Sequence, residues 1–203
     1  ESAWQADLGD EPTQPVVVGD RLFVASVDDH TLHCLTAGSG KALWEFTTGG
    51  RIDSPPTYFR GRLLFGSADG WVYCLRAADG ALAWKFRAAP SHRKVVRFGQ
   101  IESAWRVHGN VLMVDGVAYC TAGRSTYLDG GIYMYGLDPV TGKTLYEHCF
   151  EGPFPDLPEE PAWAFHMKGA RSEVLVSDEA AVQVLDGVLH GRGQSHCGGD
   201  PDG

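Results

Sequence analysis

The sequence predicts an all-β fold, and three observations support this prediction. A unit of about forty residues recurs along the first 150 residues, short runs of alternating apolar residues fill each unit, and pairs of turn-forming residues separate the runs. Four strands in a unit of this length are typical of one blade of a β-propeller, in which four-stranded antiparallel sheets surround a central axis. We therefore expect a partial β-propeller of about three blades with fragments of their neighbours.

Three aligned segments carry the repeat most clearly. Residues 35–44, 75–84 and 137–146 each hold a leucine, a glycine and a large aromatic residue at the same spacing. A single blade exposes both faces of its sheet and buries them only against its neighbours, so we expect the aromatic residue to lie largely buried between adjacent sheets. The residues expected to dock one blade on the next are Trp4, Trp44, Trp84, Tyr146, Gly40, Gly80 and Gly142.

The strands within a unit follow from a sequence period of two. Short β-prone runs fill the first complete unit at residues 16–18, 21–25, 31–35 and 42–46. Turn residues separate the runs of the second unit at Arg60-Gly61, Asp69-Gly70 and Asp79-Gly80. An Asp-Gly pair between alternating apolar runs predicts a two-residue hairpin turn, because both residues tolerate positive φ.

The phase of the repeat divides the chain into segments. We expect, in order, the end of a preceding blade at 1–12, blade A at 13–50, blade B at 51–100 with an insertion at 90–100, blade C at 101–152, a Pro- and acid-rich insertion at 153–172, a candidate start of a further blade at 173–186 and a disordered tail at 187–203. After the first insertion, Ile101-Glu102-Ser103 is expected to resume the phase of Ile52-Asp53-Ser54. Closed propellers need roughly 4–8 blades, so we expect the chain to form part of a larger ring.

The composition is that of an acidic globular protein. Seventeen Lys and Arg residues against 26 Asp and Glu residues give a formal net charge of −9, which argues against nucleic acid as a partner. No apolar run approaches the roughly 18 residues of a membrane-spanning helix, so we expect no membrane span. The five cysteines include no Cys-x-x-Cys pair, and those in apolar runs are expected to be small buried residues.

No group of residues in the sequence predicts a catalytic or metal centre. Asp28, Asp29 and Asp69 stand at predicted turns, where an Asp carboxylate accepts hydrogen bonds from nearby backbone. The His-Cys pairs at 33–34, 148–149 and 196–197 lack the spacing of metal ligands. Gly-x-Ser-x-Gly frames and phosphate-binding glycine loops are also missing. We therefore predict no catalytic, cofactor-binding or metal-binding residue.

The two insertions are better candidates for function, because propellers vary their loops on a constant scaffold. The insertion at 90–100 carries the one basic cluster of an acidic chain, which either docks an acidic partner or is a solvated loop. The Pro- and acid-rich insertion carries aromatic residues, which form either a lid over the ring or packing beneath it. The candidate partner-binding residues are His92, Arg93, Lys94, Arg97, Phe154, Trp163 and Phe165.

One motif links the repeat to a known family. Asp69-Gly70, a short strand ending in Leu75, and Asp79-Gly80 followed by Trp84 resemble the pyrroloquinoline-quinone (PQQ) repeat, and blade C supplies the closest form, Leu137-Asp138-Pro-Val-Thr141-Gly142-Lys143. The resemblance covers residues 1–152 well and 173–186 weakly. In this family the aromatic residue of each repeat docks the next blade, and Tyr146 departs from the usual tryptophan.

The resemblance implies two branches of function. Quinoprotein dehydrogenases of the family hold PQQ and Ca²⁺ at the centre of the ring and tend to carry a vicinal cysteine disulfide and calcium-binding asparagines. Cofactor-free members, such as the propeller lipoprotein of the outer-membrane barrel-assembly machinery, are docking scaffolds. Here no two cysteines are adjacent, and the only asparagine is Asn110.

We therefore expect a non-catalytic binding or scaffold module without a cofactor. By the same resemblance, it works outside the cytoplasm, in the periplasm or cell envelope, and its partners are the other blades of the chain and other proteins. Two alternatives stay open. The chain is either a sector of a PQQ- and Ca²⁺-dependent dehydrogenase or an accessory propeller fused to an unrelated enzyme.

Overall fold

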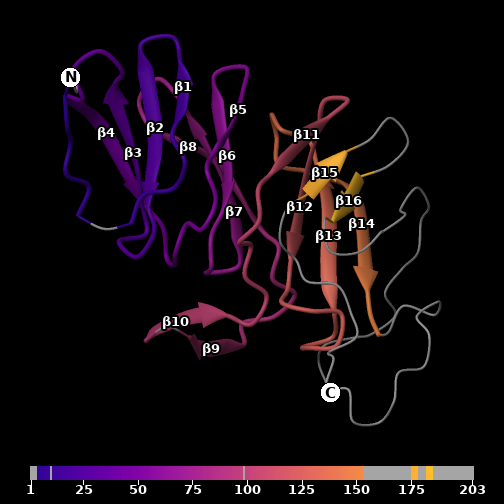
Figure 1. The fold of residues 1–203 in the computed structure, drawn as a ribbon. Helices are drawn as coiled ribbons and strands as arrows, with labels where there is room; N and C mark the ends of the chain where they lie inside the picture. Colours follow the sequence, from indigo (N-terminus) through magenta and orange to yellow (C-terminus); the bar gives the residue numbers. More distant parts are fainter. Residues whose placement is uncertain (1–3, 10, 98, 153–174, 178–181, 185–203) are drawn as a thin grey trace.

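The computed structural model describes residues 4–9, 11–97, 99–152, 175–177 and 182–184. Every regular element in these residues is a β-strand, so this part of the chain holds no helix that could cross a membrane. The described strands form three four-stranded antiparallel sheets and two separate hairpins (Figure 1).

Each four-stranded sheet is a meander whose strands lie in the order of the chain. Blade A contains β1 (Val16–Val18), β2 (Arg21–Ser26), β3 (Thr31–Thr36) and β4 (Ala42–Thr47). Blade B contains β5 (Thr57–Phe59), β6 (Arg62–Gly66), β7 (Trp71–Arg76) and β8 (Leu82–Arg87). Blade C contains β11 (Leu112–Val114), β12 (Val117–Ala122), β13 (Ile132–Leu137) and β14 (Thr144–Phe150). The hairpins are β9 (Lys94–Arg97) with β10 (Gln100–Ser103), and β15 (Leu175–Ser177) with β16 (Val182–Val184).

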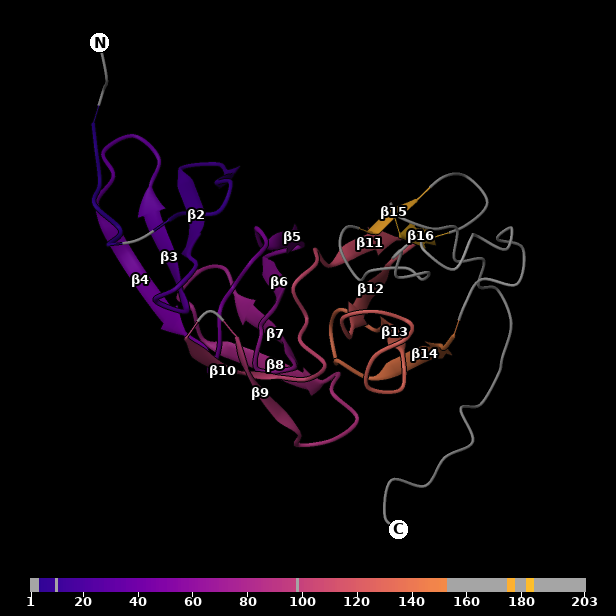
Figure 2. The same ribbon diagram turned by 60° about the horizontal axis from the view of Figure 1, so that its bottom comes forward.

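The first strands of successive sheets lie beside one another. β1 contacts β5, β5 contacts β11, and β11 contacts β15, and the sheets follow one another as separate blades (Figure 2). This is the arrangement of inner strands around the axis of a propeller. The described sheets do not close into a ring. The prediction of an all-β, partial β-propeller is confirmed.

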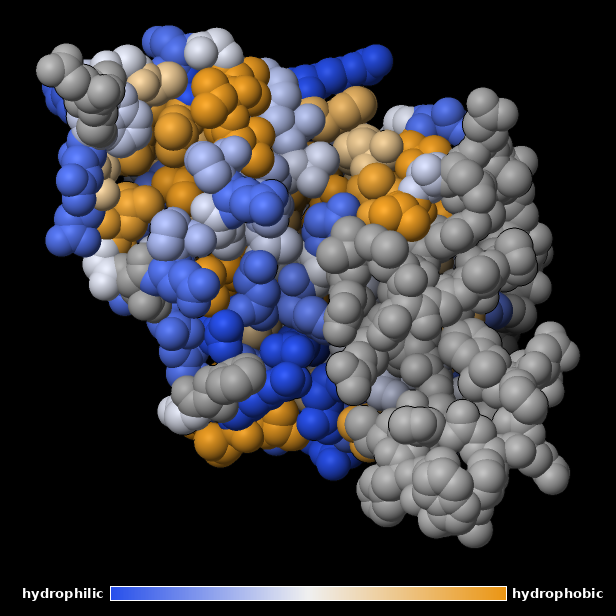
Figure 3. All heavy atoms as spheres, viewed as in Figure 1, coloured by the Kyte–Doolittle hydropathy of each residue, from blue (hydrophilic) through white to orange (hydrophobic). Residues whose placement is uncertain are grey.

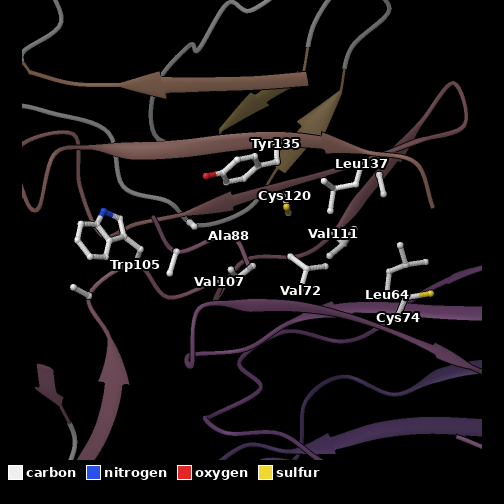
Figure 4. Close-up of a cluster of buried hydrophobic side chains, with 14 residues drawn as sticks. Leu64, Val72, Cys74, Ala88, Trp105, Val107, Val111, Cys120, Tyr135 and Leu137 are labelled. Carbon is white, nitrogen blue, oxygen red and sulfur yellow. The ribbon is translucent and has the colours of Figure 1, made fainter. Parts of the chain in front are cut away.

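Blade B shows why the repeat needs neighbours on both sides. Successive residues of a strand point to opposite faces of the sheet, so Leu63 and Phe65 of β6 pack toward blade A. Leu64 of the same strand and Val72 of β7 pack toward blade C (Figure 4). All four side chains are fully buried, and each such burial contributes roughly 1.5–3 kcal/mol to stability.

The cysteines of the apolar runs are buried, as predicted. Within the described residues, Cys34, Cys74 and Cys120 have no exposed surface and form no disulfide. Burial raises the pKa of Cys74 to about 11 and that of Cys120 to about 12, so both stay protonated at neutral pH. Cys149 is half-buried, and its thiol lies 3.3 Å from the carbonyl oxygen of Gly130. Cys197 lies outside the described residues.

The tight turns divide into two kinds. Arg60 and Gly61, with φ of 46° and 82°, form a two-residue turn between β5 and β6, as a type I′ hairpin requires. The expectation of the same turn at Asp69-Gly70 and at Asp79-Gly80 is wrong, because both glycines have positive φ but neither aspartate does. Asp69 instead accepts hydrogen bonds from the backbone N–H of Trp71 and the hydroxyl of Tyr73, at 3.1 and 2.6 Å. Its carboxylate therefore shapes a longer loop.

Because of the hairpin β9–β10, the repeat of blade C begins later in the chain than the sequence predicts. The expected equivalence of Ile101 and Ile52 is wrong: Ile101 is 64% exposed, whereas Ile52 is fully buried. Ile101 lies in β10, which pairs with β9, and its side chain points to solvent. Val107 takes the place of Ile52. The carbonyl of Arg106, just before Val107, accepts a hydrogen bond from the turn after β12. The carbonyl of Arg51, just before Ile52, accepts the equivalent bond from the turn after β6.

The hairpin β15–β16 packs against the inner side of blade C. Leu175 is 2% exposed and lies in a cluster with Leu112, Tyr119 and Phe150. Asn110 binds the backbone of Leu175 in both directions, because its Oδ1 accepts the Leu175 N–H at 2.9 Å and its Nδ2 donates to the Leu175 carbonyl at 3.3 Å. The residues at 153–174 and 185–203, with the expected insertion and disordered tail, lie outside the described residues.

Among the described residues, three tryptophans bridge successive repeats in the same way. The indole Nε1 of each donates to a carbonyl in the turn between the third and fourth strands of the next blade. Trp4 donates to Ala37 at 2.9 Å, Trp44 to Ala77 at 3.3 Å and Trp84 to Pro139 at 3.2 Å. The ring then lies on the glycine three residues further on, which is Gly40, Gly80 or Gly142. Each glycine has positive φ, between 68° and 72°.

The burial of these rings is less complete than the sequence predicts. Trp44 and Trp84 stand at equivalent places on the outermost strands β4 and β8, opposite Cys34 and Cys74. Both are only partly buried, because the following sheet covers one side of an outermost strand. Tyr146 stands at the same place in β14 and contacts the ring of Tyr119, with 6.5 Å between the ring centroids.

Replacement of Gly80 by alanine tests how closely Trp44 packs. A Cβ at Gly80 would lie 2.6 Å from Trp44, whereas a Cβ at Gly61 would meet nothing within 4 Å, although φ is positive at both positions. Gly61→Ala is expected to cost only the backbone penalty of about 1–2 kcal/mol, and Gly80→Ala about 1–3 kcal/mol more from overpacking. Urea unfolding measures both, and equal losses would show that the ring does not require a glycine.

Candidate functional site

The β9–β10 hairpin is held by all three blades. It lies below the sheets in the view of Figure 1, at the end where β2 connects to β3. Three contacts fix it: His30 of blade A with Gln100 (2.6 Å between Nε2 and Oε1), the Ala68 carbonyl of blade B with the Ser103 N–H (2.8 Å), and Asp129 of blade C with Arg93 (2.8 Å). The hairpin and the residue before it therefore contact each of the three blades.

Asp129 is the anchor on blade C. Its side chain is 5% exposed and forms ion pairs with both Arg93 and Arg124. Asp129 also has a φ of 58°, a left-handed conformation that Asp tolerates better than most residues. The loop between β12 and β13 thus presents a carboxylate to the insertion of the preceding blade.

Charged side chains meet where the hairpin joins the segments that enter blades B and C. The Nη2 of Arg51 lies 2.9 Å from Asp53, and the Nη1 of Arg106 lies 3.8 Å from Glu102 and 4.0 Å from Asp53. Glu102 is 1% exposed, and burial raises its pKa against the opposing effect of Arg106. Two guanidinium groups thus face two carboxylates, and a buried cluster of this kind is stable only because the charges are paired.

His108 lies at the edge of this cluster. Burial, together with the positive charges of Arg106 and Arg97, lowers its pKa to about 3. The imidazole is therefore neutral at pH 7, and its protonation would place a third cation beside Arg106.

The charged cluster does not fit PQQ with Ca²⁺. Calcium takes six to eight oxygen ligands, and the described residues contain no group of three or more His, Cys, Asp or Glu side chains placed to hold a metal. The carboxylates of Asp53 and Glu102 face arginines.

A cavity of about 220 Å³ opens at the foot of the hairpin, beside the end of β8. Its lining contains four basic side chains: Arg87, His92, Arg93 and Lys94. The Nη1 of Arg87 donates to His92 at 2.9 Å, while its Nη2 is buried and has no hydrogen-bond partner among the described residues. Arg87 therefore brings a permanent positive charge to the cavity wall, although its buried Nη2 is not exposed to the cavity.

The structure brings together part of the predicted basic cluster. His92, Arg93 and Lys94 line the cavity, whereas Arg97 does not and instead acts on the pKa values of Glu102 and Arg106. Phe154, Trp163 and Phe165 lie outside the described residues. Sequence reasoning missed Arg87, although its place at the end of the last strand before the insertion was the available signal.

The outer face of the hairpin is apolar. Val96 and Ile101 are cross-strand partners, 77% and 64% exposed. Figure 3 shows an apolar patch at the lower edge of the molecule, where the hairpin lies. Ile101 also lines the cavity, so the apolar pair and the basic lining form one continuous surface.

The repeated meanders, with each tryptophan on the glycine of the next repeat, define a PQQ-repeat β-propeller. A family model described as outer membrane protein assembly factor BamB (PQQ_2) matches residues 1–155. The chain belongs to this family, which confirms the predicted resemblance.

Two curated relatives represent the two branches of the family. Outer membrane protein assembly factor BamB of Moranella endobia (strain PCIT) is 36% identical over 67 residues, which cover 33% of this chain and 17% of that protein. Quinohemoprotein alcohol dehydrogenase ADH IIB of Pseudomonas putida is 25% identical over 122 residues, which cover 50% of this chain and 18% of that protein. The matches thus span less than a fifth of either relative.

A solved structure shares the fold. The crystal structure of BamB from Moraxella catarrhalis superposes with a TM-score of 0.53 at 18% identity, covering 72% of this chain and 39% of that one. A likeness at this identity supports the propeller fold alone.

His108 predicts how stability depends on pH. Its folded pKa of about 3 lies below the usual value of 6.5, so the unfolded chain binds a proton that the folded chain does not. Stability contributed by the neutral form is present above pH 6.5 and is lost as the pH falls toward 3. His108→Gln is expected to remove roughly 2 kcal/mol of the loss between about pH 6 and pH 4.5. Urea unfolding at both pH values tests this, and parallel profiles for the variant and the parent would contradict it.

Proposed function

We infer that the chain is a sector of a non-catalytic, protein-binding scaffold propeller, and that the β9–β10 hairpin carries its binding surface. One observation carries the proposal: three blades hold the hairpin in place, while its outer face exposes Val96 and Ile101. A rigid support beneath exposed apolar side chains lowers the entropic cost of binding a partner.

The electrostatics favour binding over catalysis. The buried charges of Arg51, Asp53, Glu102 and Arg106 face one another, which suits a structural joint better than an acid–base site. Catalytic acids and bases are tuned toward the working pH, whereas His108 is shifted to a pKa of about 3.

Family membership supports an extracytoplasmic setting. The family model and one curated relative bear the name outer membrane protein assembly factor. By this similarity, the chain works in the periplasm or cell envelope of a bacterium, without a cofactor, within an assembly of other proteins.

A second candidate function is a sector of a PQQ- and Ca²⁺-dependent dehydrogenase. Its support is the similarity to quinohemoprotein alcohol dehydrogenase ADH IIB, which covers half of the chain. Against it stands the poor fit of the charged cluster to a hard cation.

Titration of the full-length protein with PQQ and Ca²⁺, followed by tryptophan fluorescence, separates the two candidates. The scaffold is expected to give no saturable quenching. Apo quinohemoprotein alcohol dehydrogenase is the positive control, and magnesium in place of calcium controls for ionic strength. Saturable micromolar quenching that requires Ca²⁺ would overturn the scaffold proposal.

A further inference from the structure

We propose that the cavity at the foot of β9–β10, together with Val96 and Ile101, docks an extended acidic segment of a partner protein. A carboxylate of that segment enters the cavity, and an adjacent apolar side chain covers the exposed pair. The inference rests on the proposed scaffold function and names the chemistry of the partner.

The lining of the cavity favours an anion because it holds four basic side chains and two acidic ones. Asp69 accepts hydrogen bonds from Tyr73 and from the backbone of Gly49 and Trp71, and Glu102 faces Arg106. Each of these two carboxylates is held by partners of its own, and neither forms an ion pair with Arg87 or Lys94.

The cations, in contrast, keep unused capacity. Within the described part of the chain, Arg87 donates to the neutral acceptor His92 and forms no ion pair, and Lys94 forms none either. Arg93 is already paired with Asp129, so Arg87 and Lys94 are the groups that would hold the incoming charge.

The apolar pair supplies the second contact. Val96 and Ile101 project side by side from neighbouring strands, and Ile101 also borders the cavity. An acidic residue in the cavity therefore places the next outward-facing side chain of an extended peptide near this pair. Alternate residues of an extended chain point to opposite sides, which suits a segment of alternating acidic and apolar residues.

No described strand pairs with the outer edge of β9. The Ser103 N–H donates to Ala68 rather than to β9, so the backbone groups of Ser103 point away from its partner Lys94. Lys94 and Ser103 are therefore a pair without hydrogen bonds between them, and in an antiparallel ladder the backbone N–H and C=O groups of both residues in such a pair point away from the partner strand. The pattern repeats every two residues, so the backbone groups of Val96 also point outward. The outward backbone groups of Lys94 and Val96 are thus placed to pair with an extended segment.

Charge argues against other occupants of this surface. A second copy would bring Lys94 close to its own equivalent if the two β9 edges paired, and two like charges directly opposite one another are destabilising. An acidic segment with apolar residues is the occupant that the local charge and the exposed pair both favour.

The test measures fluorescence anisotropy of a short labelled peptide of alternating valine and glutamate with the full-length protein. Arg87→Gln is expected to weaken binding about tenfold or more. Val96→Ser combined with Ile101→Ser, two exposed positions, is expected to weaken it about tenfold. Arg76→Gln is the matched control, because Arg76 is exposed and pairs with Asp79 in the β7–β8 turn.

Several outcomes would overturn the docking site. The site would be contradicted if Arg87→Gln bound the peptide with unchanged affinity, or if a valine–lysine peptide bound equally well. It would also be contradicted if inorganic phosphate at the peptide's concentration competed fully, or if the protein self-associated and the Val96 and Ile101 variant did not. Thermal unfolding of each variant verifies that it is folded. A flat PQQ titration with no peptide binding removes this site and leaves the scaffold function standing, whereas calcium-dependent PQQ binding removes the scaffold function itself.

Discussion

The stacking of one tryptophan on one glycine sets the spacing of the blades, and the rest of the structure depends on it. A blade has two apolar faces and cannot bury either alone. The indole of Trp44 or Trp84 binds a carbonyl of the next blade and covers the glycine three residues beyond it. The indole hydrogen bond and the contact of the ring with the glycine thus fix the distance between neighbouring blades and their register. Buried leucine and phenylalanine side chains supply most of the stabilisation.

The proposed binding surface depends on this spacing between blades. The β9–β10 hairpin meets blade A through Gln100 and blade C through Arg93, so a change in the angle between blades would release one of these contacts. Beneath it, paired charges from the segments entering blades B and C join the hairpin to the scaffold. A two-stranded hairpin is marginally stable on its own, so the strands that carry the exposed apolar pair depend on their contacts with the three sheets.

The sequence predicts the parts of the fold that repeat and misses those that occur once. Strand order, buried cysteines and the tryptophan–glycine pairs all follow from spacing, because each repeat solves the same packing problem. The hairpin folds back to His30, seventy residues away, and such contacts leave no local pattern. The repeat aligns Ile101 with Ile52 wrongly for this reason. The sequence shows only that Arg87 ends the last strand before the insertion, and the cavity beside it is formed by the fold of that insertion.

A double-mutant cycle between Trp84 and Gly142 tests most directly whether the tryptophan–glycine contact docks the blades. A Cβ at Gly142 would lie 2.7 Å from the ring of Trp84, so Gly142→Ala should cost less once Trp84→Leu has removed the ring. Urea unfolding of the four proteins is expected to give a coupling free energy of about 1–2 kcal/mol. Additive losses, within about 0.5 kcal/mol, would contradict the account.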